Sequence, residues 1–109
     1  MTTMDILQWL QEWFKAQCNG SWEHMSGIRI STLDNPGWDI KIELENTDLE
    51  GLELKLQMIS KNNDDWYGIK VEGNLFEGFG DPTKLGFLLL KFKEIVENHS
   101  SSLDDIASP

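Results

Sequence analysis

Three side chains close to the end of the first predicted helix could do chemistry: the thiol of Cys18, the carboxylate of Glu23 and the imidazole of His24. A cysteine with a histidine base and a carboxylate suits a small hydrolase or transferase, provided that all three converge in one pocket. Adjacent residues on extended backbone point to opposite faces, so Glu23 and His24 make no ready acid–base pair. A cysteine that closes an amphipathic helix usually packs as a small buried residue. We therefore expect structural hydrogen bonding at Glu23 and His24, with the thiol enzyme as the alternative.

The spacing of the other reactive residues does not favour metal or phosphate chemistry. Met25 and Ser26 follow His24, so HExxH is absent, and the second histidine, His99, lies at the far end of the chain. A single cysteine gives no zinc-ligand spacing. The chain has neither a G-x-S-x-G elbow nor a Walker loop, and the glycines of residues 73–80 do not form a dinucleotide fingerprint. We expect no metal, no cofactor and no enzymatic activity.

Net charge is the most informative bulk property of the chain. Nineteen acidic and nine basic residues give a formal charge of −10, which opposes both nucleic acids and anionic membranes as partners. Residues 39–53 contain six acids and one base. Solubility explains a general excess of acids, but concentrated charge favours the steering of a basic partner protein. The six acids are Asp39, Glu43, Glu45, Asp48, Glu50 and Glu53, and the base is Lys41.

The length and the cysteine count limit the classes of protein to which this chain could belong. A chain of 109 residues forms one domain that buries roughly two-thirds of its unfolded surface. One cysteine cannot form an internal disulfide, which suits the reducing cytoplasm. The N-terminus has no basic n-region or cleavage site, so we expect no signal peptide. The longest apolar run, residues 86–90, is too short to cross a membrane.

Two amphipathic helices are predicted near the ends of the chain. Residues 4–17 carry apolar side chains at spacings of three and four, which is the helical period. Asp81 and Pro82 supply an N-cap and a first-turn proline for the second helix. Residues 99–109 lack enough apolar surface to order themselves, so we expect a flexible acidic tail after a domain of residues 1–98.

Alternating apolar and polar residues predict the strands between these helices. The segments are residues 28–32, 38–44, 52–58 and 66–73, while the two glycines of residues 74–80 favour a short edge strand. We predict an α+β fold: an N-terminal helix, an antiparallel four- to five-stranded meander sheet and a C-terminal helix. Both helices should cover the apolar sheet face and leave the other face bare, and we expect this bare face to be predominantly anionic. We place Asp39, Lys41, Glu43, Lys55 and Gln57 on the bare face, and Leu10, Phe14, Ile40, Ile42, Leu88 and Phe92 in the core.

Several short motifs, in order along the chain, resemble immunity protein family 53 of bacterial polymorphic-toxin systems. The resemblance covers about residues 5–96, and Phe14 stands where the family usually has tyrosine. It is carried by WLQxW at 9–13, QCxGxWEH at 17–24, Gly27-Ile28, TLDNPGW at 32–38, Thr47-Asp48-Leu49, Asp65-Trp66 and FxGxG at 76–80, where x is any residue.

The resemblance implies a small cytoplasmic protein, encoded beside a toxin, which binds and blocks that toxin without chemistry of its own. The concentrated acidic charge fits a toxin with a basic active surface, such as a nuclease. We therefore predict neutralisation of a cognate toxin by occlusion, and a regulatory module with another basic partner is the further alternative; the oligomeric state stays open. Tryptophans beside turns can anchor interfaces, although each can equally serve the core. The candidate partner-binding residues are Trp22, Glu23, His24, Asp34, Asp39, Glu43, Glu45 and Trp66.

Overall fold

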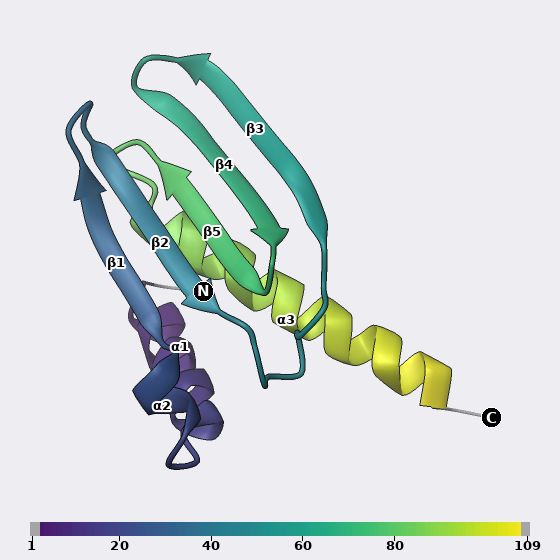
Figure 1. The fold of residues 1–109 in the computed structure, drawn as a ribbon. Coiled ribbons are helices and arrows are strands. Elements are labelled where there is room, and N and C mark those ends of the chain that lie inside the picture. The colour runs from purple at the N-terminus through teal and green to yellow at the C-terminus, as the bar shows by residue number, and fades with distance from the viewer. Residues whose placement is uncertain (1–2, 108–109) are drawn as a thin grey trace.

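The computed structural model describes residues 3–107, and the side chains of residues 5–99 within them. The described elements are two helices, five strands and a final long helix, and the strands form one antiparallel sheet (Figure 1). The predicted α+β fold is therefore confirmed. The elements are α1 Thr3–Gln17, α2 Trp22–Met25, β1 Ile28–Leu33, β2 Gly37–Glu43, β3 Leu54–Asn62, β4 Asp65–Glu72, β5 Leu75–Gly80 and α3 Leu85–Ala107.

The strand order is β1-β2-β5-β4-β3, so the predicted meander is wrong. The connection of residues 44–53 runs past the ends of β5 and β4 to reach β3 at the edge (Figure 1). β5, predicted as an edge strand, lies between β2 and β4. Its glycines suit that central place, because a Cβ at Gly78 would approach the Phe76 ring to 3.3 Å and Leu88 to 3.4 Å. Alternation predicts strands but carries no information about their neighbours.

Both long helices pack on one face of the sheet, as predicted. Phe92 of α3 is central, with its ring 4.9 Å from that of Trp13 and 5.0 Å from that of Phe76. Each large apolar side chain buried here contributes about 1.5–3 kcal/mol. Phe14 is the exception among the predicted core residues, because it stays 38% exposed on α1. The shared cluster includes Ile6 and Leu10 of α1, Ile40 and Ile42 of β2, and Leu88, Leu89 and Phe92 of α3.

The ends of α3 differ from the prediction. The helix begins at Leu85 instead of Pro82, because Asp81 and Lys84 close a separate turn in which the Lys84 N–H donates to the Asp81 carbonyl at 3.0 Å. The helix then continues to Ala107, through most of the segment predicted as a tail, whose last two residues lie outside the described part. The flexibility of that tail stays a prediction. No helix within the described residues has the length and apolar character needed to cross a bilayer.

Candidate partner-binding site

The three residues of the possible thiol enzyme lie at the corner between α1 and α2. The Glu23 carboxylate accepts hydrogen bonds from the backbone N–H groups of Asn19, at 2.9 Å, and Gly20, at 2.7 Å. Its own backbone N–H is the largest cause of a lowered pKa, and those two N–H groups add to it against the opposing effect of burial. Both Glu23 carboxylate oxygens therefore hold the loop between α1 and α2, which confirms the predicted structural hydrogen bonding of this residue. The geometry gives the thiol enzyme no support.

Two details of this corner correct the prediction. Residues 22–25 form the one-turn helix α2 rather than extended backbone. Cys18 is exposed rather than buried, and its thiol donates to the Phe14 carbonyl at 3.3 Å. Within the described part of the chain, no three His, Cys, Asp or Glu side chains gather as a metal site would require.

Trp22 belongs to the core of the corner. The residue is 2% exposed, and its ring packs edge-on against the rings of Trp13 and Phe14, with centroid distances of 5.9 Å and 5.8 Å. The indole Nε1 is buried without a hydrogen-bond partner. A rigid partner cannot reach this ring, so Trp22 holds α2 against α1 instead of offering an anchor.

The sheet face opposite α1 and α3 is referred to below as the open face. Residues directly opposite each other on neighbouring strands share a face, so the strand register defines its members. Of the predicted partner-binding residues, Asp39, Glu43 and Trp66 lie on the open face. Glu45 lies beside this face, in the loop that follows β2. Asp34 lies in the β1–β2 turn, and His24 is exposed on α2. The open face consists of Arg29, Ser31, Asp39, Lys41, Glu43, Met58, Ser60, Trp66, Gly68, Lys70, Glu72, Leu75, Glu77 and Phe79.

The open face is not predominantly anionic, which corrects the prediction. Its bases pair with its acids at nitrogen–oxygen distances of 3.6 Å (Arg29–Glu43), 3.5 Å (Lys41–Asp39) and 4.0 Å (Lys70–Glu77). The sequence shows the acids of β2 together, but the bases Arg29 and Lys70 come from other strands and lie beside the acids of this face only in the folded sheet. The face is therefore locally neutralised, and its acids offer directional contacts rather than free charge.

A bulge in β3 also moves one predicted residue of this face. Leu54 pairs with Val71 and Gln57 pairs with Ile69, so one extra residue of β3 lies between these pairs. Gln57 consequently shares the helix-covered side with Ile69 instead of facing outward. Alternation alone cannot reveal such a shift.

The carboxyl groups of Glu77 and Asp39 lie together near the centre of the open face. Burial raises the pKa of Glu77, and so do a hydrogen bond with Asp39 and the charge of that neighbour. Lys41 and Lys70 oppose this rise. Sequence reasoning missed Glu77, because β5 was placed at an edge where its side chains would have had few neighbours.

Replacing Glu77 with glutamine should stabilise the fold more at pH 7 than at pH 4. A carboxyl whose folded pKa is raised above 4.5 contributes stability below that value, and this stability is lost as the pH rises through the folded pKa. Melting of the wild type and E77Q at both pH values measures the difference. E72Q, on the same face, removes the same charge and is the control. Equal effects of E77Q at the two pH values would contradict the assignment.

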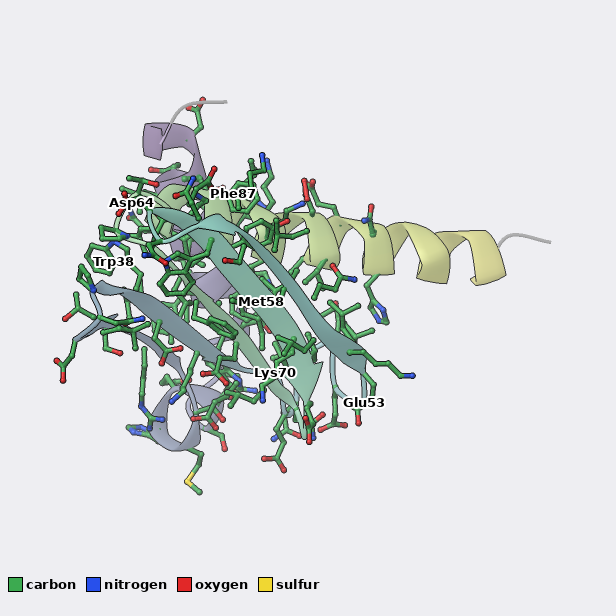
Figure 2. The ribbon with its side chains drawn as sticks, turned by 90° about the horizontal axis from the view of Figure 1, so that it is seen from above. Trp38, Glu53, Met58, Asp64, Lys70 and Phe87 are labelled. Atoms are coloured by element: carbon green, nitrogen blue, oxygen red, sulfur yellow. The ribbon has the colours of Figure 1, made fainter. Side chains whose placement is uncertain are left out.

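Apolar side chains occupy a band of the open face that extends from β3 to β2. A Cβ at Gly68 would approach the Phe79 ring to 2.5 Å and the Met58 sulfur to 3.0 Å, so both side chains lie against this glycine. The Trp66 ring lies over Gly37 in the same way, at 3.3 Å from a Cβ built there. Met58 is 49% exposed and lies in the middle of the edge strand β3 (Figure 2). These residues form an apolar area beside the ion pairs.

Residues 45–53 are referred to below as the acidic loop, and they adjoin the end of the sheet where β2 stops and β3 starts. The loop is held firmly, because Leu49 is 2% exposed in the core and the Gly51 N–H donates to Asn74 Oδ1 at 2.7 Å. The Thr47 hydroxyl adds a hydrogen bond of 2.7 Å to the Leu44 carbonyl. Its acids are all exposed, and they are Glu45, Asp48, Glu50 and Glu53.

The buried carboxylate of Asp81 positions Trp66. The sequence pattern predicted only a helix N-cap at this residue. Asp81 is 0% exposed and accepts hydrogen bonds from the Trp66 N–H at 2.9 Å and the Lys84 ammonium at 2.8 Å. Burial opposes its ionisation, but hydrogen bonds from Lys84, Thr83 and Trp66 outweigh that effect and hold the pKa of Asp81 well below its usual range. Lys84 also donates to Asp65 at 2.8 Å. This network joins the start of β4 to the turn before α3.

The structure is that of a small α+β protein in which one face of the sheet stays uncovered by the long helices. The family described as immunity protein 53 matches residues 7–97. The chain therefore belongs to the immunity protein 53 family, and the resemblance of its motifs is confirmed. No match was found among curated proteins or among solved structures.

Proposed function

We propose that this chain neutralises a cognate polymorphic toxin in the cytoplasm by covering the active surface of that toxin, without chemistry of its own. Membership of the immunity protein 53 family supports a role in immunity to a toxin. The observation that carries the mode of action is the open face, where Met58, Phe79 and Trp66 form an apolar area beside paired charges. Interfaces commonly combine apolar, aromatic contacts with a polar rim.

The acidic loop supplies the long-range attraction in this proposal. The open face neutralises most of its own charge through ion pairs, whereas Glu45, Asp48 and Glu53 are exposed together at one end of the sheet. A negative surface accelerates encounter with a basic partner, and a nuclease is a suitable partner because its active surface must attract phosphates. Glu43 would then make directional contacts after docking, whereas Asp39 is only 9% exposed and pairs with Lys41 within the face. Asp34 and His24 are peripheral candidates.

Co-expression with the toxin encoded beside this chain tests the proposal. We expect the two proteins to purify together at low salt, and the chain to restore growth of cells that produce the toxin. A C18A variant should protect equally well, because binding does not use the thiol. Failure of both complex formation and growth rescue would refute toxin neutralisation, and loss of rescue in C18A alone would favour the thiol enzyme.

A further inference from the structure

We propose that the toxin contributes an extended segment that pairs with β3 as a sixth strand of the sheet. The inference depends on the proposed function and adds to it the mode of recognition. Strand addition uses backbone hydrogen bonds for affinity and side-chain contacts on both faces for specificity. It therefore requires a long, accessible edge strand with contacts to offer on each side.

β3 meets the first requirement. It lies at the end of the strand order, pairs with β4 on one side, and is nine residues long. Eight of those residues are exposed, and Leu54 alone is half-buried. The backbone groups on the outer side of an edge strand have no partner within the sheet, so they are available to an added strand. The other edge strand, β1, has six residues.

β3 also presents apolar side chains to both sides of the sheet. Met58, 49% exposed, lies opposite Gly68 on the open face. Ile59, 45% exposed, lies opposite Tyr67 on the side of α3. Leu56, 55% exposed, lies within the bulge. Natural edge strands are commonly blunted by charge, and a stretch with exposed apolar side chains on both faces indicates a pairing site.

Charge favours a partner chain over a second copy of this protein. Two copies of β3 in antiparallel pairing centred on Met58 would place Lys55 of each copy opposite Lys61 of the other, and like charges directly opposite are destabilising. Each copy also carries a net charge of −10. The occupant is instead an extended segment of a basic protein, with apolar side chains in its middle and acidic or uncharged ones opposite the two lysines. Glu53, at one end of the β3 ribbon in Figure 2, would attract the basic flank of such a segment.

The two edges of the sheet provide a matched test with the toxin encoded beside this chain. Ile59 of β3 and Ile30 of β1 are isoleucines of similar exposure, 45% and 42%, and both lie on the helix-covered side. I59K should weaken toxin binding at least about tenfold, because the lysine opposes an apolar strand at that edge, whereas I30K should leave the affinity within about twofold. Amide hydrogen exchange on the wild-type complex gives a second measurement that needs no variant. Amides of β3 should exchange more slowly in the complex, and those of β1 should not.

The outcomes separate this inference from the proposed function. A toxin that neither binds nor is neutralised would refute both. Tight binding with growth rescue, unchanged β3 exchange and an unaffected I59K variant would overturn strand addition while leaving neutralisation in place. A dimer of the isolated chain that I59K dissociates would overturn the choice of occupant.

Discussion

Replacing Asp81 with alanine should lower the thermal midpoint of this chain by on the order of 10 °C. The Asp81 carboxylate is 0% exposed and accepts hydrogen bonds from the Trp66 N–H, the Thr83 N–H and the Lys84 ammonium. Alanine removes all of these acceptor contacts at once. It leaves buried donors unsatisfied and a mostly buried ammonium with one partner fewer, and both changes are strongly destabilising. Circular dichroism melting at pH 7 measures the effect.

Asp65 supplies the control for this prediction. It binds the same ammonium at 2.8 Å, but its side chain is 45% exposed, so D65A should change the midpoint by only a few degrees. The pH dependence gives a second check. Since the folded pKa of Asp81 lies below its ordinary 3.8, its stabilising effect is present above pH 3.8 and is lost as the pH falls toward the folded value. The gap between wild type and D81A should therefore shrink in acid, and a constant gap would show that charge is not the cause.

The network around Asp81 shows what local sequence patterns reveal and what they miss. Asp-Pro before an apolar helical period is a correct sign that a chain reversal precedes α3. The same residues cannot reveal that the carboxylate reaches the backbone of Trp66, fifteen positions earlier. Helices and strands are identified by local periodicity, so the apolar faces of α1, β2 and α3 were all predictable from the sequence. The buried network depends on contacts between distant segments, so it was not.

The open face illustrates the same limit for the candidate site. The side of β2 that carries Asp39 and Glu43 followed from alternation, and the structure confirms it. The electrostatic character of that face did not follow, because Arg29 and Lys70 come from other strands and the order of those strands includes a crossover. Side-chain direction is a property of one strand, whereas the charge of a sheet face is a property of all of them. The concentrated acids of residues 45–53 lie in a loop outside the sheet, and their side chains remain exposed there.

Reversing the charge of Glu45 and Asp48 together should slow association with the toxin by about 10- to 1000-fold at low salt. Both residues are exposed on the acidic loop, so lysine at these positions removes part of the attractive field without disturbing a buried contact. The thermal midpoint should change little, since surface charges contribute little to stability. The effect should fade as added salt screens charges farther apart than the Debye length, about 10 Å at 0.1 M. Stopped-flow mixing of the chain with the purified toxin at several salt concentrations measures the rate.

A second variant separates the place of the charge from its amount. Asp34 and Asp64 are exposed in the β1–β2 and β3–β4 turns, at the end of the sheet away from the acidic loop. Reversing both adds four units of charge, as in the first variant, and each protein then carries −6 instead of −10. Because an electrostatic field declines within a Debye length in salt, only reversal close to the docking surface should slow association strongly. Equal slowing by the two variants would mean that net charge alone steers the partner, and stronger slowing by the Asp34 and Asp64 variant would move the docking surface to the opposite end of the sheet.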